Sequence, residues 1–177
     1  MFVLAVRAML ATVLTVAAVG KVRNRQAFGE FAAWVQTLPA PGARARPLPV
    51  LAVAAEASIA AGMGLGVTTP YALVASGLLF TVFAAAVQRV HRRGLVVECL
   101  CFGAERGQLG LMHASRDGLL AVAAFAAALM QIAAFHVQPG LAESYTAIVL
   151  GLILAGFVIS LENIVALTIG PSRDLSV

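Results

Sequence analysis

The sequence predicts an all-α protein, a polytopic bundle of helices that cross a membrane. Of its 177 residues, 61% are hydrophobic and only 11% are charged, and the mean hydropathy is +0.95. Soluble domains carry about 25% charged residues, so this chain would precipitate unless lipid surrounded it. Its apolar runs are too long and continuous for barrel strands, and helices satisfy their backbone hydrogen bonds internally within a bilayer. We therefore expect one integral membrane domain over residues 1–177.

Five apolar runs predict the helices that cross the bilayer, each near the roughly 20 residues needed for a hydrocarbon core of about 30 Å. The third run begins with Thr69 as its N-cap and Pro70 at the first helical position. The fifth run holds Glu162 and Asn163, so its inner end is less apolar than its start. The predicted spans cover residues 2–20, 48–67, 70–90, 115–135 and 145–169.

A short amphipathic helix is predicted between the first two spans, over residues 24–38. Arg25, Glu30 and Gln36 lie mostly off its apolar face. This pattern is typical of a helix that lies along the membrane interface, with Trp34 at the depth of the lipid headgroups. The apolar face carries Phe28, Phe31, Trp34, Val35 and Leu38.

Small residues recur at helical spacing in two of the spans. Ser58, Gly62 and Gly66 are four residues apart, and Gly151 and Ala155 repeat that spacing. Faces of this kind let helix backbones approach closely in a membrane. Because alanine and glycine are abundant throughout the chain, chance would also supply some such pairs.

Basic residues between the spans predict the orientation in the membrane. Of the 12 lysines and arginines, five lie between the first two spans and five around the connection between the third and fourth. The positive-inside rule therefore places these two connections in the cytoplasm, the N-terminus outside and the C-terminus inside. This asymmetry at a cell membrane explains the basic composition, so no nucleic-acid partner is expected. The ten residues are Lys21, Arg23, Arg25, Arg44, Arg46, Arg89, Arg92, Arg93, Arg106 and Arg116.

The two cysteines of the chain stand one residue apart, in the run Cys99-Leu100-Cys101-Phe102-Gly103. Two such thiols can form a disulfide, bind a soft metal ion or exchange electrons with a partner. Free thiols titrate near pKa 8.5, and nearby cations favour the thiolate, although Glu98 opposes them here. A C-x-C disulfide closes a tight ring, which we expect to be strained and readily exchanged. The cations close in sequence are Arg92, Arg93 and Arg106.

Other interpretations of the cysteine pair stay open. The two residues could be unreactive, or they could bind Cu(I) or another soft ion with His91 or His113 as a further ligand. No second cysteine pair completes a zinc site, so we predict no bound metal and no cofactor.

Charged residues inside the predicted spans form a second candidate site. Glu56 lies about two turns into the second span, among apolar neighbours. An intramembrane carboxylate is a functional candidate by default and is expected to be paired or protonated. Lys21 ends the first span on the same predicted side, which makes it the nearest candidate partner. A functional and a purely structural role are equal alternatives for Glu56, whereas Arg7 is expected to snorkel towards the outer surface.

An ordered set of residues over about residues 1–135 carries a family resemblance. It runs from Gly20-Lys21 at the end of the first span, through Glu56 and the cysteine motif, to Arg116 at the start of the fourth. With this arrangement the chain resembles the MauE family of methylamine-utilisation membrane proteins, which is related to DoxX-like four-helix proteins. The other matching residues are Phe28, Pro49, Phe80-Thr81 and Arg93-Gly94.

The resemblance implies a DoxX-like four-helix core, to which this chain adds a fifth, C-terminal transmembrane helix. It also implies the maturation of a client protein through disulfide chemistry, alongside a thioredoxin-like redox protein. In methylamine utilisation that client is the disulfide-rich small subunit of methylamine dehydrogenase. Leu100 stands where the family commonly has glycine, so we expect the redox properties of this thiol pair to differ from those of the family. The client lies outside the cytoplasm and the charge pattern places the thiols inside, so the direction of electron transfer stays open.

We therefore expect Cys99 and Cys101 to cycle between dithiol and disulfide, while Glu56 and Lys21 handle the proton or hold the cysteine segment against the bundle. One alternative is a soft-metal carrier or sensor. Another is a non-catalytic membrane scaffold that binds a partner through its small-residue face. A quinone-linked oxidase is less favoured because no cofactor fingerprint is present.

Overall fold

The computed structural model describes residues 1–37, 47–66, 68–92, 111–133 and 140–169, with side chains for all of these except 111–113 and 161–169. The described segments contain helices and no strand, which confirms the predicted all-α class. The helices are α1 (Phe2–Val22), α2 (Arg25–Thr37), α3 (Leu48–Gly64), α4 (Thr69–Arg92), α5 (Leu111–Ala133) and α6 (Leu141–Ile169).

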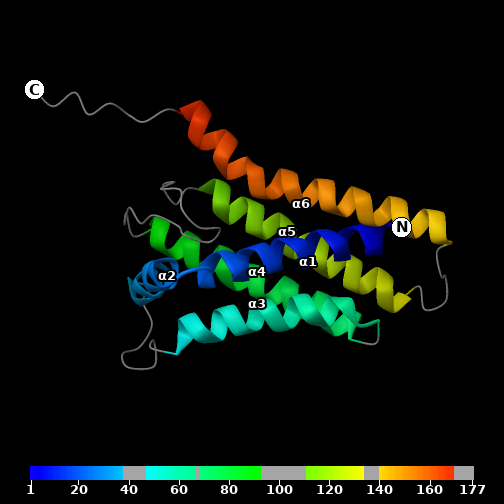
Figure 1. Cartoon of the computed structure of the whole chain (residues 1–177), viewed down its shortest axis with the longest axis horizontal. Coiled ribbons are helices and arrows are strands. Elements are labelled where there is room, and N and C mark those ends of the chain that lie inside the picture. The colour runs from blue at the N-terminus through cyan, green and yellow to red at the C-terminus, as the bar shows by residue number, and fades with distance from the viewer. Residues whose placement is uncertain (38–46, 67, 93–110, 134–139, 170–177) are drawn as a thin grey trace, which may run out of the picture.

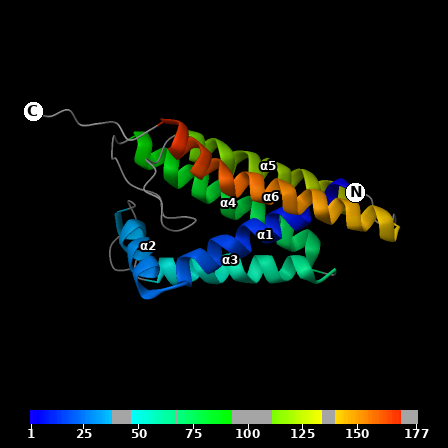
Figure 2. The same cartoon turned by 45° about the horizontal axis from the view of Figure 1, so that its top comes forward.

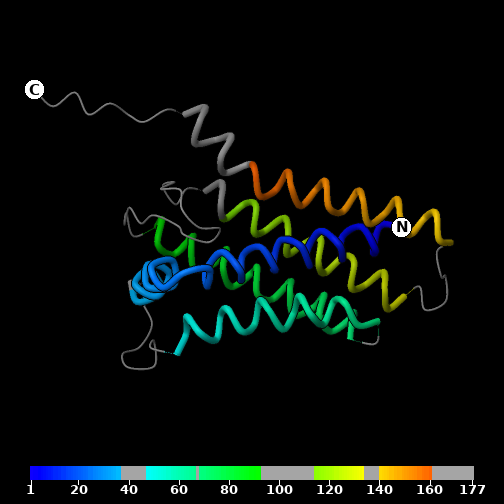
Figure 3. The backbone as a smooth tube through the Cα atoms, viewed as in Figure 1, coloured from blue at the N-terminus to red at the C-terminus, as the bar shows by residue number. Residues whose placement is uncertain are grey.

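Five of these helices lie side by side as a bundle, and α2 crosses one end of it (Figures 1 and 2). The chain passes back and forth along the bundle (Figure 3). Helices α1, α4 and α6 run towards the end where α2 lies, whereas α3 and α5 run away from that end. We call this end of the bundle the α2 end. Helix α1 is central, because it contacts α2, α3, α5 and α6.

The core of the bundle is built from aliphatic side chains on α1 and small side chains on α5. Leu10, Val13 and Leu14 of α1 are almost completely buried and share one core cluster with Leu73 of α4. Helix α5 contributes alanines, which let neighbouring backbones come close, as is common in membrane bundles. The alanines of α5 in this core are Ala121, Ala124, Ala127 and Ala128.

Helix α3 is shorter than the predicted span 48–67 because the chain leaves the helix at Gly64. Leu65 is extended (φ −98°, ψ 118°), and the Thr68 hydroxyl donates a hydrogen bond of 2.6 Å to the carbonyl oxygen of Gly62. The 17 residues of α3 rise about 25 Å, somewhat less than a typical hydrocarbon core. Four other helices, α1, α4, α5 and α6, are long and apolar enough to cross a membrane. Helix α4 includes Thr69, the predicted N-cap, as its first residue.

One of the two small-residue faces makes the close helix contact that the sequence predicts. A Cβ atom on Gly151 of α6 would overlap the carbonyl oxygen of Ala5 and lie 2.8 Å from the Cβ of Ala8, both on α1. Ala155, four residues on, is fully buried. This part of the prediction is confirmed.

The face of α3 with Ser58, Gly62 and Gly66 differs from the prediction. A Cβ atom added to Gly62 would lie 3.4 Å from the Cβ of Ala72, which is an ordinary van der Waals contact. A Cβ atom added to Gly66 would have no atom within 4 Å. The Ser58 side chain is exposed, and its hydroxyl donates to the Ala55 carbonyl of its own helix. Spacing alone therefore identified one contact on this face, because the turn after Gly64 takes Gly66 out of the helix.

The apolar face of α2 packs on the protein, and the predicted position of this helix along the membrane interface stays a prediction. Phe31, Trp34 and Val35 are buried, with exposed fractions of 1%, 6% and 5%, and they pack against Val87 of α4. The partly buried residues around them are Ala52 and Val53 of α3 and Ala114 of α5. Helix α2 is therefore a cap over three other helices of the bundle.

Candidate functional site

The α2 end of the bundle brings together two of the charged residues that the sequence singled out, Lys21 and Glu56. Lys21 lies in the last turn of α1, and Glu56 lies in the middle of α3, whose start is at the same end (Figure 1). Because α1 and α3 are antiparallel neighbours, the long lysine side chain reaches along the bundle to the carboxylate.

Lys21 and Glu56 form a buried ion pair. The Lys21 Nζ atom donates to Glu56 Oε1 at 2.6 Å, and each side chain is only 1% exposed. Desolvating two charges costs several kcal/mol, which their attraction offsets only when the geometry is good. The pair therefore links α1 to α3 through a buried, charge-assisted contact.

Two aromatic rings complete the surroundings of the ammonium group. The Nζ atom of Lys21 lies 5.2 Å from the ring centroid of Phe31 on α2 and 5.8 Å from that of Phe83 on α4. An ammonium within about 6 Å of a ring face is attracted by the π electrons, more strongly when water is excluded. Lys21 is thus held by groups from α2, α3 and α4 at once.

The carboxylate of Glu56 is only half satisfied. Its Oε2 atom is buried and has no hydrogen-bond partner among the described residues. Asp117 of α5 is close enough to act on Glu56 electrostatically. Asp117 Oδ1 accepts hydrogen bonds from Nε and Nη2 of the adjacent Arg116 at 3.1 and 3.0 Å. Four charges from three helices therefore gather at the α2 end.

Arg7 lies far from this group and makes a structural contact. Its Nε atom donates to the carbonyl oxygen of Met63, near the C-terminal end of α3. The sequence predicts that the Arg7 side chain snorkels to the surface, but the side chain binds this carbonyl instead. The carbonyl is available because the last carbonyls of a helix lack partners in their own helix.

The predicted cysteine pair, Cys99 and Cys101, lies outside the described residues, as do Arg93 and Arg106. These residues belong to the stretch 93–110, which joins Arg92 at the end of α4 to Leu111 at the start of α5. Both helix ends are at the α2 end of the bundle (Figure 1). The structure therefore brings Lys21 and Glu56 together and leaves their relation to the thiols as a prediction.

No group of three or more histidine, cysteine or acidic side chains that could hold a metal ion occurs in the described part of the chain. His91, one of the two histidines named as further ligands for a soft ion, is exposed on α4. The side chain of the other, His113, is outside the description.

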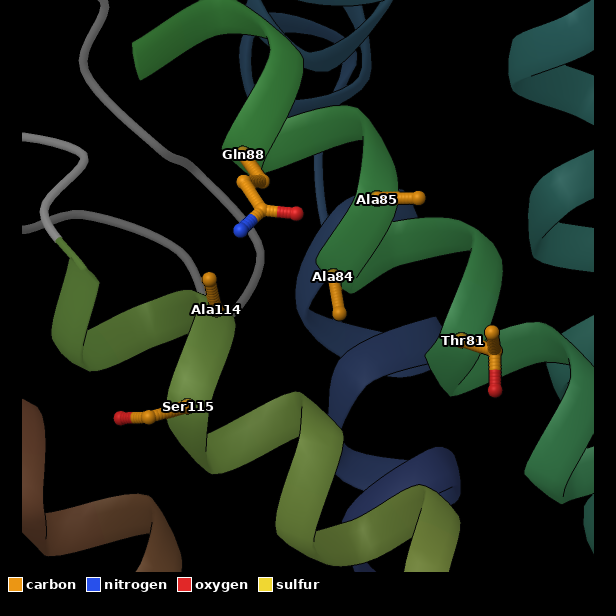
Figure 4. Close-up of a pocket in the computed structure, with 6 residues that line it drawn as sticks. All are labelled: Thr81, Ala84, Ala85, Gln88, Ala114 and Ser115. Carbon is orange, nitrogen blue, oxygen red and sulfur yellow. The ribbon is translucent and has the colours of Figure 1, made fainter. Parts of the chain in front are cut away.

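An open hollow of about 450 Å³ lies between α4 and α5 near the same end. Figure 4 shows that small side chains, Ala84 and Ala114, form part of its wall, with Thr81, Gln88 and Ser115 around them. The Thr81 hydroxyl donates to the Gly77 carbonyl of its own helix at 2.7 Å. The hollow borders the helix ends that flank the cysteine stretch, and Ala85 completes its lining.

Sequence reasoning missed Asp117 and the two rings on Lys21. Asp117 could have been found, because it lies inside the predicted span 115–135 and an acid in a span is a candidate by the rule that selected Glu56. Phe31 was identified only as part of an apolar face, and nothing in the sequence signals that Phe83 lies beside a lysine of another helix.

A family model of methylamine utilisation protein MauE matches residues 1–130. The chain belongs to the MauE family. The match covers α1 to α4 and nearly all of α5, so it includes Lys21, Glu56, Asp117 and the cysteine stretch. It ends before α6, which is the helix that this chain adds to the matched region. No curated protein and no solved structure matches the chain.

Membership of the MauE family and the helical bundle together identify a membrane protein of methylamine utilisation.

Proposed function

We propose that this MauE family member is a membrane thiol–disulfide protein that assists the maturation of a client protein through Cys99 and Cys101. The observation that carries the proposal is that the only two cysteines of the chain stand one residue apart within the region matched by the family. The buried charges at the α2 end support it, since α4 ends and α5 begins there, on either side of the cysteine stretch.

The proposed exchange keeps atoms and electrons in balance. A client dithiol gives two electrons and two protons to the Cys99–Cys101 disulfide, so that an S–S bond forms in the client and the pair becomes a dithiol. A thioredoxin-like protein in its disulfide form then takes the same two electrons and two protons from the pair. The reverse sequence would reduce the client, and both directions use the same mixed-disulfide intermediates.

Lys21 and Glu56 are proposed to support this chemistry from the bundle. They either handle the proton that a thiol loses or hold the cysteine stretch against the helices. Support for a functional role comes from their burial, because a charged pair with one unsatisfied carboxylate oxygen is costly to keep where a hydrophobic pair would pack.

The proposed location is the cell membrane, with the N-terminus outside and the α2 end in the cytoplasm. Exposed cations support this orientation because they gather at the α2 end, where the positive-inside rule expects them. The described cations there are Arg23, Arg25, Arg89 and Arg92.

The test is mixed-disulfide trapping in cells that express the full chain with its client and the thioredoxin-like protein. We expect Cys99→Ser and Cys101→Ser, made singly, to accumulate a disulfide-linked complex through the remaining thiol, and the double variant to trap none and to leave the client immature. Full maturation of the client with the double variant would contradict the redox role.

The same variants separate the two rival functions. A soft-metal carrier would bind about one ion per chain, lose it with either cysteine and trap no mixed disulfide. A scaffold would tolerate the loss of both cysteines and would fail when the exposed Ser58 face of α3 is changed to a bulky residue.

A further inference from the structure

The second oxygen of the Glu56 carboxylate is a buried polar atom that the ion pair leaves unused. Oε1 accepts the Lys21 ammonium at 2.6 Å, whereas Oε2 is buried and receives no donor from any described residue. We propose that Glu56 Oε2 is a reversible proton-binding site within the bundle, and that Asp117, Phe31 and Phe83 keep Lys21 charged when Glu56 is neutral.

The surroundings of Lys21 make such a site physically reasonable. Protonating the carboxylate of an ordinary buried ion pair would leave an uncompensated ammonium, which is strongly unfavourable in a low-dielectric interior. Here the ammonium also faces the rings of Phe31 and Phe83, at 5.2 and 5.8 Å. These faces attract a cation whatever the state of Glu56, because the attraction comes from the ring electrons.

Asp117 supplies the second negative charge of the site. It acts electrostatically on Glu56, and Glu56 in turn holds the ammonium of Lys21. When Glu56 takes up a proton, Asp117 keeps one negative charge among the charged groups of the α2 end. Asp117 is itself held by Arg116, so its carboxylate is fixed in place rather than free to leave the site. Asp117 is therefore a positioning residue for this site.

The exposure of the charged side chains increases from Glu56 towards the surface. It is 1% for Glu56, 6% for Asp117 and 12% for Arg116. The described charged groups at the site are Lys21 from α1 and Asp117 and Arg116 from α5, while α2 and α4 contribute Phe31 and Phe83. The charged side chains of α5 are therefore more exposed than Glu56, while rings from α2 and α4 flank its partner Lys21.

The proton site itself rests on the described residues of the bundle, and only its use in thiol chemistry rests on the proposed function. A thiol that attacks a disulfide must first lose its proton. The unprotonated Oε2 would accept that proton and would return it when a leaving thiolate is protonated.

Infrared difference spectroscopy of the full chain in lipid bilayers tests the site through the carbonyl stretch of a protonated carboxylic acid. On acidification we expect a band at the high frequency of a buried carboxylic acid with few hydrogen bonds, apart from the bands of the solvent-exposed acids. This band should be absent in Glu56→Gln and retained in the exposed control Glu30→Gln. Asp117→Asn, Phe31→Leu and Phe83→Leu should each weaken the band at a given acidic pH. A wild-type protein that stays folded and gives no such band would overturn the proposal, whether or not the Glu56→Gln protein folds.

The Cys99→Ser/Cys101→Ser double variant distinguishes this proposal from the proposed function. If the band persists in that variant, the proton site exists independently, even if client maturation proves indifferent to the cysteines. If the band disappears, the proton-binding site is not built from the bundle residues, and the proposal is wrong.

Discussion

At the scale of single residues, the ion pair between Lys21 and Glu56 links α1 to α3 through a contact of 2.6 Å. Removing Lys21 leaves the buried carboxylate alone, so we expect Lys21→Met to lower the free energy of unfolding by about 3–5 kcal/mol. Glu56→Gln should cost less, because the rings of Phe31 and Phe83 still attract the Lys21 ammonium. The double variant should lose less than the sum of the two, because neither charge is then left unpaired. Equilibrium unfolding of the full chain in mixed detergent micelles measures this double-mutant cycle.

The control is Arg25→Met, which removes an exposed cation at the same end of the bundle. It should change the free energy of unfolding by no more than about 0.5 kcal/mol. Strictly additive losses for Lys21 and Glu56 would mean that the two charges do not stabilise one another.

The sequence was sufficient to find Lys21 and Glu56, because charges in apolar runs stand out against their neighbours. It was not sufficient to find what surrounds them. The rings of Phe31 and Phe83 reach Lys21 only after α2 folds over the bundle, and that contact depends on the packing of three helices. Asp117 falls between these cases, since its type and position were visible but its proximity to Glu56 was not.

At the scale of helices, α6 is attached to α1 through Gly151. A Cβ there would overlap the backbone of Ala5, which cannot move aside as a side chain can. We expect Gly151→Ala to push α6 away from α1 and to lower the free energy of unfolding by about 1–3 kcal/mol. Unfolding in mixed micelles measures the effect.

Gly156 provides a matched control on the same helix. No atom lies within 4 Å of the Cβ it would gain. Since alanine forms helix better than glycine by up to about 1 kcal/mol, Gly156→Ala should be neutral or stabilising. Equal losses at both positions would show that the close contact of α6 with α1 is not what holds α6 in place.

Helix α2 gives a second prediction at this scale, because it carries Trp34, the only tryptophan of the chain. Trp34 is 6% exposed and stacks with Phe31 at a centroid distance of 6.1 Å. Phe31→Ala should loosen α2 from the bundle and shift the tryptophan emission to longer wavelength. Gln36→Ala, an exposed position on the same helix, should leave the emission unchanged; a shift there as large as for Phe31→Ala would contradict the docking of α2.

The case of α2 also explains a limit of sequence reasoning about helices. Periodicity correctly predicted an amphipathic helix, but it identifies an apolar face without naming what that face meets. Lipid and protein are equally apolar partners for Phe31, Trp34 and Val35, so the choice between them depends on the shape of the bundle end. The small residues of α6 were more informative, because close backbone approach leaves few alternatives to another helix.

At the scale of the whole molecule, charge is distributed unevenly between the two ends of the bundle. The exposed cations Arg23, Arg25, Arg89 and Arg92 all lie at the α2 end, while Arg7 is the cation of the opposite half among the described residues. The family match and the number of apolar helices establish a membrane protein, and this asymmetry supports one orientation of it. The side on which the α2 end lies decides which redox proteins can reach the cysteine stretch.

The orientation is tested by labelling single cysteines in a Cys99→Ser/Cys101→Ser background with a thiol reagent that cannot cross membranes. Arg25→Cys places a thiol on α2, and Leu141→Cys places one at the start of α6, where the native side chain is 94% exposed and lies at the opposite end (Figure 1). Because cations are retained in the cytoplasm, we expect Leu141→Cys to react in intact cells and Arg25→Cys only after the cells are opened. The reverse pattern would place the α2 end outside, where the thiols could act on an extracytoplasmic client without any passage of electrons through the bundle.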